Sequence, residues 1–165
     1  MIATHAIRLR PAVPADFDAV NAVIERAVMT WNLTARVKRL TLPSYRYTEH
    51  DLVHLHIVVA EDADRALLGV AAWEPATVRD LPTGKTELLL HGLYVDPAQQ
   101  RAGVGSCLLD AARMAAREQG FDGLLVKARP EAERFFLARK LEPLPVRDPD
   151  HDYLHRFWSA TPQHG

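Results

Sequence analysis

The stretch from Leu88 to Ala112 constrains the fold of this chain more than any other. It begins with an apolar run, residues 88–95, that is typical of a strand buried on both faces. Asp96-Pro97 ends this run because proline cannot donate to a strand ladder. The segment QRAGVG follows and leads at once into a helical pattern. The apolar stripe expected on that helix consists of Val104, Leu108, Ala111 and Ala115, with Cys107 beside it.

A strand followed by a glycine-bearing turn and a helix can hold a phosphate group. The first turn of a helix leaves N–H groups without partners, and the helix dipole makes that end electropositive. Gly103 and Gly105 let the backbone approach an anion, and Arg101 adds a positive charge. The segment lacks the lysine of a Walker loop, and position 108 is leucine where the dinucleotide fingerprint needs glycine. The turn therefore predicts a pyrophosphate site of another kind.

The pattern QRAGVG after LYVDP resembles the coenzyme A motif of the GNAT N-acetyltransferase superfamily. The segment IRLRPAVPADFDAV resembles the opening of GNAT domains, and AERFFLARKLEP resembles a later family segment. The resemblance covers about residues 6 to 158. It implies an α/β (α+β) GNAT fold, with a mixed, mostly antiparallel sheet of six to seven strands and about four helices. We expect residues 1–160 to form a single acetyltransferase domain and residues 161–165 to form a flexible tail.

Periodicity predicts the remaining elements. We expect helices from Pro14 or Ala15 to about Met29, over 35–40, and from Pro130 to about Ala138, with loop from Pro43 onward. Further strands are expected over 5–10, 52–60, 67–73, 124–126, 141–146 and 153–158. In the second of these, one face would carry Val53, Leu55, Ile57 and Val59. The opposite face would carry His54 and His56.

The resemblance also implies which residues bind acetyl-CoA as co-substrate. Backbone N–H groups of residues 101–106 would bind the pyrophosphate, and residues 93–95 would pair with the pantetheine arm as if it were a strand. Arg129 stands where an asparagine often contacts pantetheine, and Phe136 stands where many members carry a tyrosine acid. The expected cofactor-binding residues are Leu93, Tyr94, Val95, Gln100, Arg101, Ala102, Gly103, Val104, Gly105, Ser106, Arg129 and Phe136.

Acetyl transfer to an amine requires the amine to be neutral. An amine with a pKa near 10.4 is mostly protonated at pH 7, and neutralising it costs about 4 to 5 kcal/mol, so a general base is useful. His91 is the best placed titratable group, beside Gly92, which marks a candidate bulge. In some GNAT enzymes a histidine at the matching position is the base; the alternative here is a hydrogen-bonded core histidine. Glu74 is a second candidate, acting through water.

Phe136 cannot protonate a leaving thiolate, so that role is absent or moved. Its loss would slow transfer by about 100- to 10,000-fold rather than prevent it. On the acceptor side we expect Trp31, Tyr45 and Trp73, although aromatic residues that merely cover the core are an equal alternative.

The function we expect is an acetyl-CoA-dependent N-acetyltransferase in which a small-molecule amine attacks the thioester directly. The alternative is an acyl-CoA-binding GNAT-like module with little or no turnover. A third hypothesis is a zinc site at His54 and His56 with His91. No nearby pattern of residues that would hydrogen-bond and orient these histidines supports it, and we expect no metal.

Composition narrows the class of partner. The 165 residues suit one domain, and the formal net charge of −1 gives no electrostatic case for nucleic acid or anionic membrane. Cys107 is the single cysteine, which excludes an internal disulfide and suits a reducing, cytoplasmic location. No apolar run has the length of a membrane span, and the start lacks a signal core. GNAT domains often dimerise, so a second copy of the chain is a candidate partner.

Overall fold

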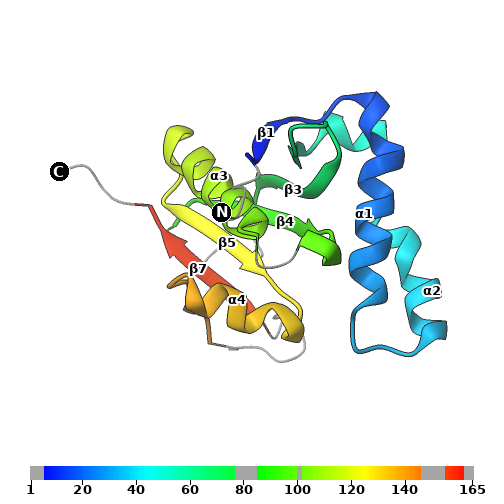
Figure 1. The fold of residues 1–165 in the computed structure, drawn as a ribbon. Coiled ribbons are helices and arrows are strands. Elements are labelled where there is room, and N and C mark those ends of the chain that lie inside the picture. Colours follow the sequence, from blue (N-terminus) through cyan, green and yellow to red (C-terminus); the bar gives the residue numbers. More distant parts are fainter. Residues whose placement is uncertain (1–5, 77–84, 100–101, 146–154, 162–165) are drawn as a thin grey trace, which may run out of the picture. The chain divides into compact units, whose positions relative to one another are not determined.

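The computed structural model describes residues 6–76, 85–99, 102–145 and 155–161 (Figure 1). Its helices are α1 (Phe17–Met29), α2 (Ala35–Tyr45), α3 (Val104–Glu118) and α4 (Glu133–Ala138). Its strands are β1 (Arg8–Pro11), β2 (His56–Glu61), β3 (Leu67–Pro75), β4 (Glu87–Val95), β5 (Gly123–Lys127), β6 (Glu142–Pro143) and β7 (Arg156–Ala160). Short 3-10 turns occupy Pro14–Asp16, Glu49–Val53, Pro97–Gln99 and Pro130–Ala132.

The described strands form one mixed sheet. Their order is β1-β2-β3-β4-β5-β7-β6. β4 and β5 are parallel, whereas the β1–β2, β5–β7 and β6–β7 pairs are antiparallel. This sheet of seven strands and the four α-helices of the described part confirm the predicted fold class.

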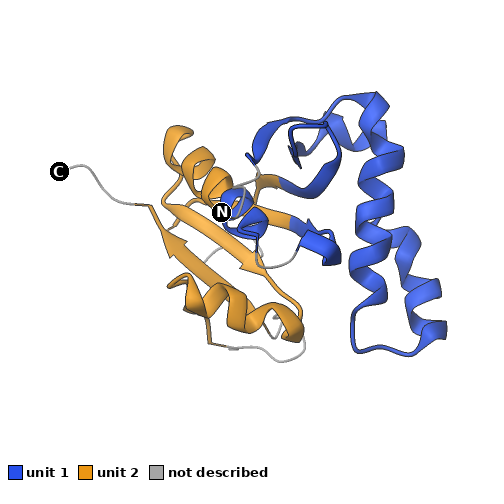
Figure 2. Ribbon diagram, viewed as in Figure 1, with its two compact units in different colours: residues 1–72, 92–109 blue, residues 73–91, 110–165 orange. Residues whose placement is uncertain are grey.

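The chain divides into two compact units (Figure 2). Unit 1 comprises residues 1–72 and 92–109, and unit 2 comprises residues 73–91 and 110–165. The boundary between the units therefore falls within β3, β4 and α3.

Helix α1 supplies much of the core of unit 1. Its buried residues recur at helical spacing and are Phe17, Val20, Val23, Ile24, Ala27 and Val28. They belong to one cluster with Ile57 and Val59 of β2, Val70 of β3 and Tyr94 of β4. Burying a large apolar side chain contributes roughly 1.5–3 kcal/mol. The predicted amphipathic helix ending at Met29 is confirmed.

Unit 2 is organised around β5. Residues 87–90 of β4 pair with it in parallel from Glu87–Gly123 to Leu90–Val126. Helix α3 ends at Glu118, and Gly120 follows it with a left-handed backbone, at φ of +79°. The N–H of Phe121 donates to the carbonyl of Ala116 at 2.9 Å, which is the bond of a Schellman motif.

The predicted strand over 52–60 begins later than expected. Residues Glu49–Val53 form a 3-10 turn, and β2 starts at His56. The Thr48 N–H donates to the Asp51 carboxylate at 2.7 Å, and this capping pair fixes the turn. Val53 is 73% exposed, so its predicted place on the buried face was wrong.

Two helical predictions also need correction. Helix α2 continues past Leu40 to Tyr45, with Pro43 inside it, because Leu42 and Tyr45 pack on the core of unit 1. On α3 the fully buried residues include Leu109, Ala112 and Ala116 with Val104 and Leu108, whereas Ala111 and Ala115 are only partly buried.

The two last strands are shorter than predicted. Strand β6 covers Glu142–Pro143 of the predicted 141–146, and β7 begins at Arg156. Residues 146 and 153–154 of those predictions lie outside the described residues.

Candidate functional site

The turn that follows β4 is fixed by Asp96. Its N–H donates to the carbonyl of Leu68 at 2.8 Å, and its carboxylate accepts from the N–H of Ala98 at 3.1 Å. The guanidinium of Arg26, on α1, donates to the same carboxylate at 2.7 Å. Burial alone would raise the pKa of Asp96, but the hydrogen bonds from Arg26 and Ala98 outweigh it and lower that pKa. Asp96 thus ties the end of the central strand to helix α1.

Helix α3 begins at Val104, directly after Gly103. Gly103 has φ of +86°, and a Cβ built on it would meet no atom within 4 Å. The N–H of Cys107 donates to the carbonyl of Gly103 at 3.0 Å, so the amides just after Gly103 belong to the first helical turn. Val104 is 1% exposed and anchors this helix end in the core. Such an end is suited to bind an anion.

The predicted cofactor residues of this turn are only partly visible. Gln100 and Arg101 lie outside the described residues. Ala102 is exposed, and Gly105 and Ser106 are half-buried beside Gly103 and Val104. The pyrophosphate site at this turn therefore stays a prediction.

Strand β4 becomes less buried along its length. Residues 87–90 are buried, whereas His91 is exposed and Gly92, Leu93 and Val95 are half-buried. Tyr94 is 9% exposed and belongs to the core cluster of unit 1. The predicted pantetheine-binding residues thus lie on the less buried half of the strand.

An aromatic cluster of Trp31, Tyr45, Tyr47 and Tyr94 lies in unit 1. The rings of Trp31 and Tyr45 meet edge to face with centroids 5.1 Å apart, and Trp31 stacks on Tyr94 at 6.5 Å. Tyr47 meets Tyr94 edge to face, also at 6.5 Å. The structure therefore brings two predicted acceptor residues next to a predicted pantetheine residue.

Tyr47 is a member of this cluster that is not among the predicted site residues. Its N–H donates to the side-chain oxygen of Asn21 at 2.9 Å, and the Asn21 amide donates to the Tyr47 carbonyl at 2.8 Å. Its side chain is buried. The only available sequence signal was a second tyrosine two residues after Tyr45.

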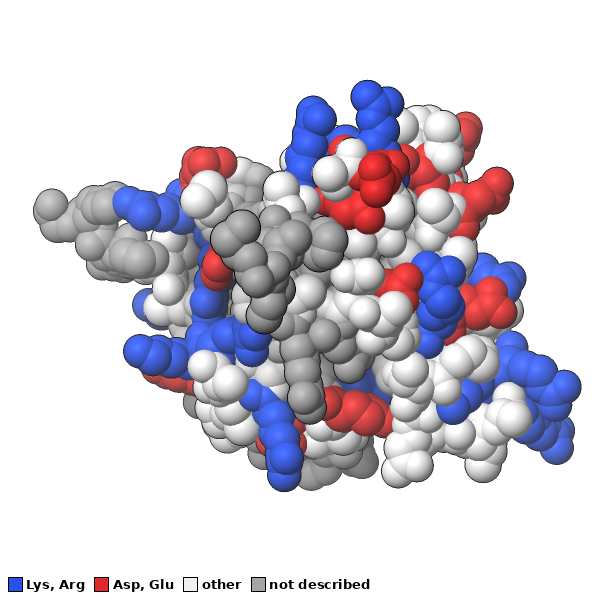
Figure 3. Space-filling model, in the orientation of Figure 1, with Lys and Arg blue, Asp and Glu red and all other residues white. Residues whose placement is uncertain are grey.

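Positive charge gathers over helix α2 (Figure 3). The helix carries Arg36, Lys38 and Arg39 and no acidic residue. The ammonium of Lys38 donates to the carbonyl of Met29 at 2.7 Å and so caps the end of α1.

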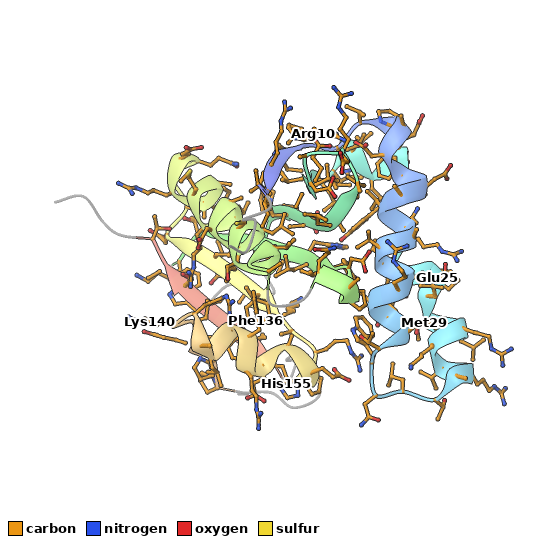
Figure 4. The ribbon with its side chains drawn as sticks, viewed as in Figure 1. Arg10, Glu25, Met29, Phe136, Lys140 and His155 are labelled. Atoms are coloured by element: carbon orange, nitrogen blue, oxygen red, sulfur yellow. The ribbon has the colours of Figure 1, made fainter. Side chains whose placement is uncertain are left out.

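The remaining predicted residues belong to unit 2. Arg129 is paired with Glu131 at 3.2 Å. Phe136, labelled in Figure 4, is 4% exposed, and its ring packs on Phe157 with centroids 5.7 Å apart. Phe136 is therefore a core residue of unit 2.

The three other predicted residues of unit 2 differ in exposure. His91 is exposed on β4, and Glu74 is half-buried near the end of β3. Trp73 is 3% exposed and lies in the core.

The histidines do not form the predicted strand face. His54 is exposed and precedes β2, and its ring faces that of His50 at 5.9 Å instead of sharing a strand face with His56. Within residues 6–76, 85–99, 102–145 and 155–161, no three His, Cys, Asp or Glu side chains are grouped to hold a metal ion. In the same ranges no helix is long and apolar enough to cross a bilayer.

The model of the GNAT acetyltransferase domain matches residues 53–139, more than half of the 165-residue chain. The chain therefore belongs to the GNAT acetyltransferases. No curated protein matches it.

Several solved acetyltransferase structures are similar to this chain. A PaiA N-acetyltransferase from Thermoplasma acidophilum, in complex with coenzyme A, is 15% identical, with 94% of this chain and 99% of that chain covered and a TM-score of 0.72. A GNAT family acetyltransferase from Brucella melitensis, in complex with acetyl-CoA, is 20% identical, with 96% and 90% covered and a TM-score of 0.65. A GCN5-related N-acetyltransferase from Ralstonia eutropha JMP134 is 18% identical, with 87% and 98% covered and a TM-score of 0.71. At these identities the likeness shows a shared fold.

Proposed function

We propose that this chain is an acetyl-CoA-dependent N-acetyltransferase in which the amine of a small-molecule acceptor attacks the thioester directly. The observation that carries the proposal is the start of α3, where Gly103 has φ of +86° and a Cβ built on it would meet no atom within 4 Å, in the turn region between β4 and α3. The coenzyme A and acetyl-CoA complexes of the Thermoplasma and Brucella proteins support the choice of cofactor.

In this proposal each part of the site has one task. Amides of residues 102–106 bind the pyrophosphate, and the backbone of residues 93–95 orients the pantetheine arm. Acetyl-CoA supplies an activated thioester. A backbone N–H of β4 stabilises the charge that develops on the carbonyl oxygen. The acceptor lies against the aromatic cluster, and no metal takes part.

The first prediction tests the cofactor site with two glycines at the two ends of α3. Gly103 and Gly120 have φ of +86° and +79°, and neither has an atom within 4 Å of a built Cβ. Glutamate at either position costs similar backbone strain. Only Gly103→Glu places a carboxylate at the anion site, where two lost hydrogen bonds to phosphate are worth about 3–6 kcal/mol. We therefore expect acetyl-CoA affinity to fall by about 100-fold or more in Gly103→Glu alone, measured by titration calorimetry.

Gly120→Glu is the matched control for this experiment. It should bind acetyl-CoA as the wild type does. Equal losses in both variants would mean that backbone strain, and not the anion site, is responsible. Absence of acetyl-CoA binding to the wild type would exclude the proposed function.

The second prediction concerns the general base. We propose that His91 accepts the proton of the attacking amine, with Glu74 as a relay through water. His91→Ala should then lower kcat by about 100- to 10,000-fold at pH 7, with acetyl-CoA affinity unchanged. The measurement is thiol release with a panel of small amines. Raising the pH should restore part of the rate, because more of the amine is then neutral. An unchanged rate at pH 7 would remove His91 from the mechanism.

An acyl-CoA-binding module with little turnover is the second candidate. It is favoured by Phe136, which is 4% exposed in the core of unit 2 and carries no proton donor. Binding of acetyl-CoA without amine-stimulated thiol release would favour this candidate over the enzyme.

A further inference from the structure

We place the acyl end of the proposed cofactor site near Gly92. This placement rests on the proposed function. The pantetheine arm would start at the backbone amides of residues 102–106 and run along β4 from its C-terminal end towards its N-terminal end. It would then pass Val95 first and Leu93 next. A strand advances about 3.3 Å per residue, so the three steps from Val95 to Gly92 cover roughly 10 Å. In the proposed function, the acyl group at the far end of this arm would lie beside the strand at Gly92.

The space beside Gly92 is filled by two tyrosines of the aromatic cluster. A Cβ built on Gly92 would overlap the hydroxyl of Tyr47 and would lie 2.8 Å from Cε2 of Tyr94. Tyr47 is 3% exposed and Tyr94 is 9% exposed. Glycine at position 92 is what allows both rings to approach the strand so closely.

Tyr47 is held in this position from helix α1. Asn21 accepts from the Tyr47 N–H at 2.9 Å and donates to its carbonyl at 2.8 Å, so one side chain satisfies both backbone groups. The edge-to-face contact with Tyr94 restrains the ring itself. A fixed, buried ring cannot move aside at low cost, because protein cores are close-packed.

We propose that Tyr47 is a specificity-determining residue that limits the transferred acyl group to acetyl. The hydroxyl of Tyr47 occupies the volume that the next carbon atoms of a longer acyl chain would need beside Gly92. One methylene in such a pocket changes discrimination by about 10- to 200-fold.

Three cofactors and three variants test this proposal without knowledge of the acceptor. The probes are acetyl-CoA, propionyl-CoA and butyryl-CoA, and the measured quantity is the ratio of each longer cofactor's Kd to that of acetyl-CoA. We expect the wild-type ratio for butyryl-CoA to be at least about 10. Tyr47→Phe frees the volume of one oxygen atom and should lower the ratio for propionyl-CoA, and Tyr47→Ala should bring both ratios near 1.

Val20→Ala is the control for general loosening of the core. Val20 is 0% exposed on the same helix as Asn21, and its truncation should lower stability without changing either ratio. Tyr47→Phe keeps the aromatic ring, so we expect it to fold. It can therefore still test the proposal if Tyr47→Ala does not fold.

The outcomes separate this inference from the proposed function. Equal affinity of the wild type for all three cofactors, or unchanged ratios in both Tyr47 variants, would overturn the role of Tyr47 and leave the acetyltransferase proposal standing. Failure of the wild type to bind any of the three would overturn both.

Discussion

Lys140 has a left-handed backbone, with φ of +64°, at the end of helix α4 (Figure 4). The N–H of Leu141 donates to the carbonyl of Phe136 at 3.2 Å, and the N–H of Lys140 donates to that of Leu137 at 3.0 Å. These two bonds are those of a Schellman motif, in which glycine usually takes the position that Lys140 occupies. Phe136 and Leu141 are both buried, so the motif closes over the core.

This conformation gives the third prediction, Lys140→Gly. A side chain in the left-handed region destabilises the folded state by about 1–2 kcal/mol. Replacing it with glycine removes this strain, but glycine also makes the unfolded chain more flexible, which offsets about 0.4–1 kcal/mol of the gain in stability. We therefore expect the free energy of unfolding to rise by about 0.5–1 kcal/mol, measured by urea denaturation. Lys140→Ala removes the same ammonium but keeps the Cβ, and it should give no such gain. A gain in Lys140→Ala instead would assign the effect to charge.

At the scale of elements, the turn after β4 and the turn before β2 show how local hydrogen bonds set boundaries. Asp96 accepts from the N–H of Ala98 and so starts the turn that the Asp-Pro pair predicted. The Thr48–Asp51 pair starts a turn before β2 in the same way, and it delays the start of the predicted strand to His56. The pattern Thr-x-x-Asp is a capping signal that apolar alternation obscured.

Helix α2 illustrates the opposite case, in which packing outweighs a local signal. Pro43 predicts a helix end, since it has no N–H to donate. The helix nevertheless continues to Tyr45, whose ring packs on Trp31, and Leu42 is buried in the same core. The stabilisation from these tertiary contacts thus outweighs the loss of the backbone hydrogen bond that Pro43 cannot make.

At the scale of the whole molecule, paired carboxylates make stability depend on pH. The pKa of Asp16 is lowered by hydrogen bonds from Arg10, which is labelled in Figure 4. Burial raises the pKa of Asp96, but the hydrogen bonds from Arg26 and from the backbone N–H of Ala98 lower it by more, so the pKa of Asp96 is lowered overall. A carboxyl whose folded pKa lies below its unfolded value of 3.8 stabilises the fold fully above pH 3.8. That contribution is lost as the pH falls through the folded pKa.

The fourth prediction follows from this linkage. The free energy of unfolding should decrease as the pH falls below about 4, measured by urea denaturation across a pH series. Arg26→Gln removes a hydrogen bond from Asp96, so the folded pKa of Asp96 should rise towards its unfolded value, and the decrease in the free energy of unfolding below about pH 4 should become smaller. At pH 7 the same variant should lose about 0.5–1 kcal/mol.

The surface ion pair of Arg46 and Glu25 provides the control for the fall in the free energy of unfolding at acid pH. Arg46 and Glu25 are separated by 3.9 Å, and both side chains are about half exposed, at 45% and 52%. Such pairs contribute little, so Arg46→Gln should leave the pH dependence nearly unchanged. Identical behaviour of Arg26→Gln and Arg46→Gln would show that Asp96 does not couple α1 to the turn.

The sequence by itself determined the strand, turn and helix around Gly103, because those conformations depend on neighbouring residues. An apolar run, an Asp-Pro pair and glycines followed by a helical stripe specify their own backbone wherever the segment lies. The same holds for α1 and for the helix end at Gly120.

Only the tertiary structure decided that Tyr47 fills the space beside Gly92 and that Phe136 lies against Phe157. These contacts join residues that are far apart in the chain, and they depend on the volume and direction of side chains that several elements bring together. No local propensity encodes such a fit, since close packing is a property of the assembled core.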